Sequence, residues 1–304
     1  MVGLSHSAFR SLVKKIGGVG AFYTEMLAAK RLPHDNPKLS PLLMKSFEEQ
    51  PLIYQLIGGD PAHIRPAVDK IHTLGAEGID LNLGCPAPMQ KRQGAGSSLV
   101  DNPSQLRSML QQLRKNTELP VSVKIRLGHQ VDDLKLMEFC LFLEGEGVDF
   151  LTIHARLIGE KFCRKPRWHG IAPAKKAVNI PIFANGGIFS VDDAKRCLEQ
   201  SGADGIMVGR GAVINPWLCR EIFDSIYSSE NSSLELDKKR IYYDFIDLLE
   251  DRFPPEKQLV RLKLFTNYYA KTFQFGHHLG SGVQSSETLV AAKEKAADFF
   301  ATVM

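Results

Sequence analysis

A cysteine in a rigid turn is the feature of the sequence best suited to chemistry. The stretch Asn82-Leu83-Gly84-Cys85-Pro86-Ala87-Pro88 ends an apolar run, and its glycine and prolines force a tight turn that projects Cys85 beyond the run. Gly94 and Gly96 follow and allow a mobile loop. A thiol placed in this way can act as a nucleophile or as a general acid or base. The alternative, an inert buried thiol, is our interpretation of Cys140, Cys197 and Cys219.

Other polar side chains stand where further apolar runs end. Lys124 can place a positive charge against an electron-rich ring or an oxyanion. The alternative for Lys124 is a strand-end lysine that only extends to solvent. His154 is a similar candidate, although an isolated histidine is more often a satisfied core residue, and Gln55 can pair with the edge of a heterocycle through its amide.

Glycine pairs follow the last two apolar runs. Asn185-Gly186-Gly187 ends one run, and Gly209-Arg210-Gly211 ends the next. Glycines after the seventh and eighth strands of a barrel let backbone N–H groups surround a phosphate, with help from a helix N-terminus. Two such pairs at consecutive strand ends therefore predict a phosphate site.

Basic residues gather in the segments that follow Cys85 and His154. Phe162 and Trp168 are interleaved with one group of them, and this mixture suits phosphate contacts together with base stacking. A solvated loop is the alternative. The candidates for RNA contact are Lys91, Arg92, Lys161, Arg164, Lys165 and Arg167. We find no metal-ligand spacing and expect no metal.

The elements that must position these groups alternate along the chain. Amphipathic stretches separate short apolar runs, which predicts a parallel sheet. One such stretch buries Leu106, Met109, Leu110 and Leu113, another Leu134, Met137 and Leu141, and Ser190 with Asp193 forms a capping box for a third. We predict strands at residues 20–26, 52–57, 79–83, 121–126, 150–154, 180–184 and 205–208.

A polar group at the end of every predicted strand favours a (β/α)₈ barrel over a doubly wound sheet, which concentrates its site at one switch point. A barrel needs eight strands, and the sequence offers seven. The chain opens with a loop and a helical pattern, so the missing strand is the first one. We expect the coding sequence to begin further upstream.

The 304 residues predict about two domains. We assign residues 1–226 to the barrel, 228–233 to a polar linker and 235–304 to a small helical bundle. The net charge of +4 is unevenly spread: residues 1–220 hold 28 basic against 21 acidic residues, and residues 221–304 hold 10 against 13. Five cysteines without paired spacing, no membrane-length apolar run and no signal-peptide core indicate a cytoplasmic protein.

Eight motifs in order over residues 1–223 make the sequence resemble the tRNA-dihydrouridine synthases, flavin enzymes that reduce the C5–C6 bond of uridines in tRNA. The motifs are Gly3-Leu4-Ser5 with Phe9-Arg10, Thr24-Glu25-Met26, Gln55-Leu56-Ile57-Gly58, Asn82-Leu83-Gly84-Cys85-Pro86, Val123-Lys124-Ile125-Arg126-Leu127-Gly128, His154-Ala155-Arg156, Ala184-Asn185-Gly186, and Gly209-Arg210-Gly211 with Asn215-Pro216-Trp217.

The resemblance implies a TIM barrel followed by a helical tRNA-binding domain, with FMN at the barrel mouth and NADPH as its reductant. It implies hydride transfer to C6 and a proton from Cys85 to C5 of a uridine flipped out of its stack. The implied cofactor contacts are Met1, Val2, Gln55, Lys124, His154, Asn185, Gly186, Gly187, Gly209 and Arg210. Arg156 joins the RNA contacts by the same analogy, and we expect a monomer.

Two departures from the family pattern bear on these expectations. The family's first motif is a strand that ends in Ala-Pro-Met, and here only Met1 matches it. In the helical domain, a Lys-His…Trp-Tyr cluster is replaced by Lys263-Leu264-Phe265-Thr266-Asn267-Tyr268. Two rival functions stay open: an FMN barrel that oxidises dihydroorotate or a free dihydropyrimidine, and a flavin-free RNA-binding relative.

Overall fold

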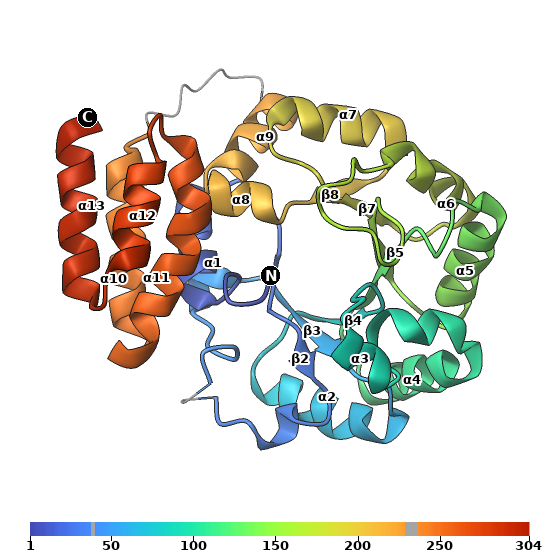
Figure 1. The fold of residues 1–304 in the computed structure, drawn as a ribbon. Coiled ribbons are helices and arrows are strands. Elements are labelled where there is room, and N and C mark those ends of the chain that lie inside the picture. Colours follow the sequence, from blue (N-terminus) through green and yellow to red (C-terminus); the bar gives the residue numbers. More distant parts are fainter. Residues whose placement is uncertain (38–39, 229–235, 304) are drawn as a thin grey trace.

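The computed structural model of the chain describes residues 1–37, 40–228 and 236–303. Parallel strands curl into an incomplete ring, and helices cover its outer side (Figure 1). The strands are β1 (Phe22–Tyr23), β2 (Leu27–Ala28), β3 (Leu52–Ile57), β4 (Gly78–Asn82), β5 (Val121–Arg126), β6 (Phe150–His154), β7 (Ile182–Asn185) and β8 (Gly205–Met207).

The helices follow the predicted alternation. They are α1 (Ser7–Ile16), α2 (Ile64–Thr73), α3 (Pro88–Arg92), α4 (Pro103–Asn116), α5 (Asp133–Gly145), α6 (Ala172–Ala177), α7 (Val191–Ser201), α8 (Arg210–Ile214), α9 (Leu218–Tyr227), α10 (Lys238–Arg252), α11 (Pro255–Tyr269), α12 (His277–Ser285) and α13 (Leu289–Val303). Short 3₁₀ turns include η2 (Phe47–Glu49). In the part of the chain that the structure describes, no helix has both the length and the apolar character needed to cross a membrane.

The sheet stays open between its first and last strands. Neighbouring strands run in the order β1, β3, β4, β5, β6, β7, β8, with β2 also paired to β3. Within the described ranges, β8 pairs only with β7 and β1 only with β3, so no strand closes the sheet between these two edges, as expected from the sequence. The N-terminal residues lie across this opening, where the N–H of Gly3 donates to Glu25 Oε2 (2.7 Å).

One predicted strand is wrong. Residues 20–26 form no continuous strand, because the ladder is interrupted after β1 and resumes at β2. The hydroxyl of Thr24 accepts the N–H of Gln55 (3.0 Å), so a side chain replaces a ladder bond at this point. The interruption places Glu25 in the segment between the two short strands.

The predicted buried face of α4 is confirmed, whereas that of α5 is wrong. Leu134 and Leu141 of α5 are exposed, and a second stripe made by Leu136, Cys140 and Leu143 is buried instead. Both stripes are apolar at helical spacing, so the sequence pattern alone does not decide between them. Ser190 caps α7 as predicted, its Oγ accepting the N–H of Asp193 (3.1 Å).

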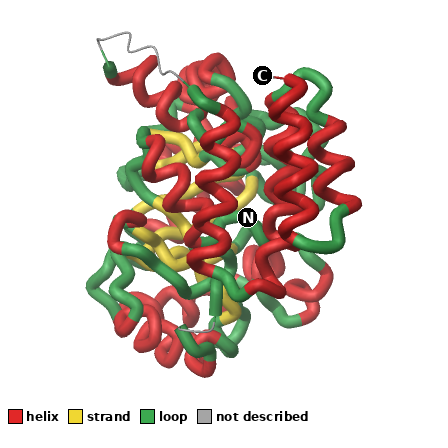
Figure 2. The backbone as a smooth tube through the Cα atoms, turned by 90° about the vertical axis from the view of Figure 1, so that its left-hand side faces the viewer, coloured by secondary structure: helices red, strands yellow, loops and turns green. Residues whose placement is uncertain are grey.

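The C-terminal helices form a separate layer beside the ring, and Figure 2 shows the long ones side by side. Their shared core is aromatic: Phe245 and Phe265 lie 3.9 Å apart between ring centroids, and the Tyr242 hydroxyl bonds Thr266 Oγ1 (2.7 Å). This layer meets the barrel mainly through α1, where His6 packs edge-on against Phe253. The predicted linker falls almost entirely on residues 229–235, which lie outside the described residues, and the division into two domains stays a prediction.

Candidate active site at the open end of the sheet

Strand register brings most of the predicted strand-end residues to one rim. Because parallel strands share a direction, alternate residues of each strand point into the ring and their carboxyl ends meet at the same edge. The register aligns the following pairs: Gln55 with Asp80, Asp80 with Ser122, Asn82 with Lys124, Arg126 with His154, and His154 with Asn185.

A buried polar chain crosses the inside of the ring at Asp80. Its carboxylate accepts from Gln55 Nε2 (2.8 Å) and Ser122 Oγ (2.6 Å), and Asn82 Nδ2 donates to Gln55 Oε1 (2.9 Å). Burial raises the pKa of Asp80. We did not predict Asp80, although a carboxylate at an inward position between Ile79 and Leu81 was the available signal.

Lys124, on β5, bridges across β6 to a residue of β7. Its Nζ donates to Asn185 Oδ1 (3.0 Å), and Asn185 Nδ2 donates to the Met207 carbonyl (2.7 Å). Burial lowers the pKa of Lys124 to about 8, despite the opposing effect of Asp80. A lysine held in this way has a desolvated charge that an anionic or electron-rich ligand would stabilise.

Cys85 lies at the start of a turn that Asn82 holds. The Asn82 Oδ1 atom accepts the N–H groups of Gly84 and Cys85, both at 3.0 Å. Arg126 Nε donates to the Gly84 carbonyl (3.0 Å), and its guanidinium is close enough to Cys85 for an electrostatic interaction. Cys85 is partly exposed, so its thiol combines a fixed backbone with access to a ligand.

The other thiols are in different surroundings. Burial raises the pKa of Cys140 and of Cys197 to about 12 and that of Cys219 to about 11, which leaves these thiols protonated and unreactive. Cys163 is exposed on the loop after β6.

An excess of positive charge surrounds His154. Burial, followed by Lys124, Arg126, Arg156 and Arg210, lowers the pKa of His154 to about 2, so the imidazole is neutral. Its Nε2 is 3.0 Å from a guanidinium nitrogen of Arg156 and can accept from it. The imidazole of His154 adds no charge of its own, and the four cations around it create a positive potential that attracts an anion to this part of the mouth.

At two glycines after β7, the backbone packs tightly against neighbouring side chains near His154. Gly186 has φ +105°, and a Cβ there would lie 2.6 Å from His154 Nε2. Gly187 has φ +76°, and a Cβ there would lie 2.6 Å from Pro166. Only glycine fits both positions without strain. Gly209 precedes α8, and the Arg210 guanidinium lies 5.0 Å from the centroid of Phe162.

The loop after β6 presents most of the predicted RNA contacts. Lys161, Arg164 and Lys165 are exposed beside Phe162, and Lys91 and Arg92 are exposed on α3. Arg167 is partly exposed and forms a two-bond ion pair with Glu160 (2.7 and 2.8 Å).

Arg156 differs from the other basic residues, because only 2% of it is exposed. Its guanidinium donates to the carbonyls of Arg164 (2.7 Å) and Phe162 (3.2 Å). Arg156 therefore holds the basic loop from beneath in this structure, and its contact with RNA stays a prediction.

Met1 and Val2 lie at the opening of the sheet. Both are exposed, and Met1 Sδ is 3.5 Å from the position that a Cβ would take on Gly209. The structure thus brings Met1 next to Gly209, a glycine of the predicted phosphate site.

Among the described residues, no group of three or more His, Cys, Asp or Glu side chains could hold a metal ion.

A curled parallel sheet with its polar groups at the carboxyl ends of the strands is the architecture of the TIM-barrel proteins. A solved structure of a 2-naphthoyl-CoA reductase complex has this fold in common with the chain, with a TM-score of 0.54 at 11% identity over 73% of this chain and 48% of that one.

Comparison with protein families is more specific. The family model described as dihydrouridine synthase matches residues 1–301. A probable tRNA-dihydrouridine synthase 1 of Synechocystis is 35% identical over 72% of this chain and 62% of its own length. A probable tRNA-dihydrouridine synthase of Rickettsia conorii is 29% identical over 100% of this chain and 92% of its own length. The chain belongs to the dihydrouridine synthase family, which is a family of enzymes.

Proposed function

We propose that this chain reduces uridine to 5,6-dihydrouridine in tRNA, using bound FMN and NADPH as reductant. The observation that carries the proposal is the placement of Cys85 on a fixed turn at the same rim as Lys124, His154 and the glycine pairs. Family membership supports the reaction class, and the basic loop after β6 supports a polyanionic substrate.

The residues at the mouth fit FMN. Burial and four cations around the neutral His154 favour a ligand with a phosphate group. The backbone at Gly186, Gly187 and Gly209 would bind that phosphate, and Arg210 supplies a positive charge. His154 and Pro166 pack where a Cβ of Gly186 or Gly187 would stand and so fix this backbone. Lys124 and Gln55 would hold the ring edge, where the Lys124 charge would stabilise negative charge on the ring. Met1 and Val2 would border the site at the opening of the sheet.

Bound FMN would supply hydride chemistry, being reduced by NADPH and delivering the hydride to C6 of the uracil ring. Cys85 would hold the proton that C5 receives, so that the C5–C6 double bond gains one hydride and one proton. The thiolate left on Cys85 would take a proton from solvent. The Asn82 side chain fixes the backbone of Cys85 and so the direction of this proton transfer.

The substrate base must leave its stack to reach the mouth. Lys161, Arg164 and Lys165 would contact phosphates beside that base, with Lys91 and Arg92 across the mouth. Phe162 is 55% exposed and offers a ring for stacking. Arg167 would act through its ion pair with Glu160, which shapes the same loop.

The test compares substrates with one preparation of FMN-loaded protein and NADPH. We expect dihydrouridine in an unmodified tRNA transcript, detected by mass spectrometry of its nucleosides, and no turnover of dihydroorotate or free uracil. Turnover of a free pyrimidine alone would instead identify a small-molecule oxidoreductase. Protein that takes up no FMN yet binds tRNA would identify a flavin-free RNA-binding protein.

A further inference from the structure

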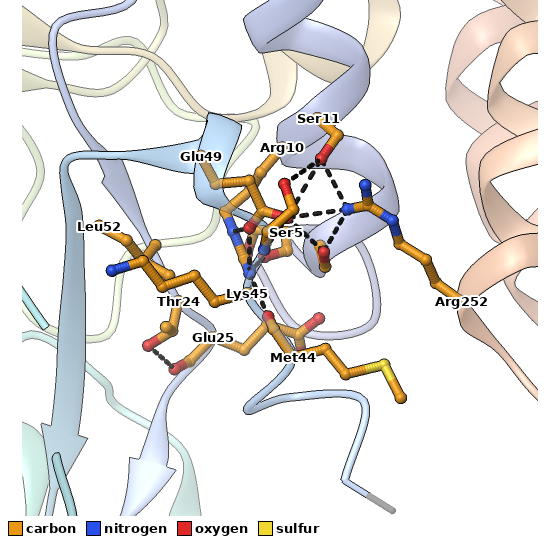
Figure 3. Close-up of polar contacts among 12 residues, drawn as sticks. Ser5, Arg10, Ser11, Thr24, Glu25, Met44, Lys45, Glu49, Leu52 and Arg252 are labelled. Carbon is orange, nitrogen blue, oxygen red and sulfur yellow. Dashed lines mark hydrogen bonds and ion pairs between the residues drawn. The ribbon is translucent and has the colours of Figure 1, made fainter. Parts of the chain in front are cut away.

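A buried carboxylate joins the barrel to the C-terminal helices. Glu49, in η2, has no exposed surface and is bonded to Arg10 of α1 and to Arg252 of α10 (Figure 3). Its Oε2 accepts from Arg10 Nε (2.7 Å), and its Oε1 accepts from Arg252 (2.8 Å) and from Ser11 Oγ (3.1 Å). The hydroxyl of Ser7 completes the set. We call these five residues the Glu49 cluster.

The cluster connects three parts of the chain that are distant in sequence. Arg252 is the last residue of α10, and it reaches across to α1, where it also donates to Ser11 Oγ (2.6 Å). Arg10 continues the connection, because it donates to the carbonyls of Ser5 and Met44, both at 2.7 Å. Ser5 belongs to the N-terminal loop that lies across the opening of the sheet. The contacts therefore run from the C-terminal helices to the edge of the mouth.

Arg252 is not needed to neutralise Glu49. Arg10 already gives the carboxylate a buried ion pair (2.6 Å), and the side chain of Arg252 retains 15% exposure. A second buried cation costs desolvation, and buried ion pairs contribute little net stability. What they provide well is a fixed geometry, because several short, directional bonds must be satisfied together.

The apolar contact between the two layers is less directional. His6 against Phe253 and Phe9 against Phe265 bring α1 and the C-terminal helices together through rings. Ring contacts stabilise the interface but tolerate small shifts. Lys15 of α1 also pairs with Asp244 of α10 (2.7 Å), but the lysine is exposed. The Glu49 cluster adds buried, directional bonds to this interface, and these bonds restrict its register more strongly.

We propose that Arg252 is a positioning residue, which holds the C-terminal helices in register with the barrel mouth through Glu49 and Arg10. This inference rests on the proposed function, because its consequence is the correct presentation of a tRNA that contacts both layers. Arg252 does not touch the mouth, so its loss affects the delivery of the substrate base and leaves the cofactor site intact.

The experiment uses the full FMN-loaded protein and three variants. Arg252→Met removes the guanidinium group and its hydrogen bonds, whereas Arg252→Lys keeps a positive charge. Lys293→Met is the matched control. Lys293 pairs with Glu250 (2.6 Å) within the C-terminal helices and makes no link to the barrel in the described residues. Readouts are FMN content, NADPH consumption without tRNA, kcat and KM for dihydrouridine formation, and hydrogen exchange of α1 and η2.

For Arg252→Met we expect FMN content and NADPH consumption within about twofold of the unmodified protein, and faster hydrogen exchange in α1 and η2. We expect kcat/KM for tRNA to fall by about ten- to a hundredfold, as misplacement of a substrate does. Arg252→Lys should recover most of this activity, and Lys293→Met should behave like the unmodified protein.

Equal kcat/KM for Arg252→Met and Lys293→Met would overturn the inference, as would loss of FMN binding in Arg252→Met, which would mean that Arg252 supports the barrel itself. Failure of the proposed function gives a different result: the unmodified protein then forms no dihydrouridine. In that case hydrogen exchange still decides the role of Arg252 at the interface, and unchanged exchange in Arg252→Met contradicts it.

Discussion

Lys124 and Asn185 are hydrogen-bonded across β6, although their strands are not neighbours in the sheet: Nζ of the lysine on β5 lies 3.0 Å from Oδ1 of the asparagine on β7. This bond fixes the ammonium of Lys124 against β7. Because burial lowers the pKa of Lys124 to about 8, the charge is desolvated and available to a ligand.

Lys124→Met should weaken FMN binding while leaving the fold intact. Removing a charged hydrogen-bond donor costs about 1.5–3 kcal/mol, which corresponds to about ten- to a hundredfold in affinity. Titration of the protein with FMN, followed by flavin fluorescence, measures the change. Lys135→Met, which removes an exposed lysine on α5, is the control.

In the unmodified protein, the affinity for FMN should also fall as pH rises through about 8, because Lys124 then loses its proton.

His154 should make the protein sensitive to acid. Its pKa is about 2 in the folded protein and near 6.5 in an unfolded chain, so the unfolded state binds the extra proton between these values. Stability is therefore full above about pH 6.5 and falls as the pH drops below it, by about 2 kcal/mol at pH 5. His154→Gln should remove this part of the pH dependence. Urea unfolding at pH 7.5 and pH 5 compares the two proteins, and parallel losses in both would contradict the assignment.

Gly186→Ala should be strongly destabilising. The new Cβ would lie 2.6 Å from His154 Nε2, and φ of +105° is unfavourable for alanine. Clash and strain together should cost about 2–4 kcal/mol. Gly159→Ala is the matched control, because φ is +89° there and nothing lies within 4 Å of the new Cβ. Thermal unfolding should show a cost of only about 1–2 kcal/mol for this control, and similar values for both variants would refute the close approach.

Neutralising the basic loop should reduce the salt dependence of tRNA binding. Replacing Lys161, Arg164 and Lys165 with glutamine should lower the slope of log K against log salt by about 0.7–0.9 for each phosphate that the loop no longer neutralises. The control replaces Lys70, Lys115 and Lys176, which stand in the last turns of α2, α4 and α6 at the opposite end of the barrel. Filter binding at several salt concentrations measures both, and equal slopes would remove the loop from the RNA-binding surface.

The rim of the sheet was predictable because parallel strands fix it. Polar residues that end apolar runs, such as Gln55, Lys124, His154 and Asn185, must meet once the runs pair in parallel. The absence of a first strand was also predictable, because the sequence opens with a loop and a helical pattern at the point where a barrel has its first strand. Asp80 was missed because Asn82 and Cys85 lie closer to the end of the same run, although Asp80 aligns with Gln55 in the register.

Other features depend on contacts that no local pattern contains. The prediction of the buried face of α5 was wrong because α5 carries two apolar stripes, and only the packing decides whether the stripe of Leu134 or that of Leu136 is buried. The burial of Arg156 depends on carbonyls of the loop that follows it. Glu49 and Arg252 are 203 positions apart, so their bond follows only from the docking of the two layers.

The proton donor is the centre of the account, and Cys85→Ala tests it most directly. FMN-loaded Cys85→Ala and Cys163→Ala are each incubated with NADPH and unmodified tRNA, and dihydrouridine is measured by mass spectrometry of the nucleosides. We predict that both variants retain FMN and consume NADPH, that Cys163→Ala forms dihydrouridine at the normal rate, and that Cys85→Ala loses about 10²–10⁴-fold in rate. Normal dihydrouridine formation by Cys85→Ala would contradict the account.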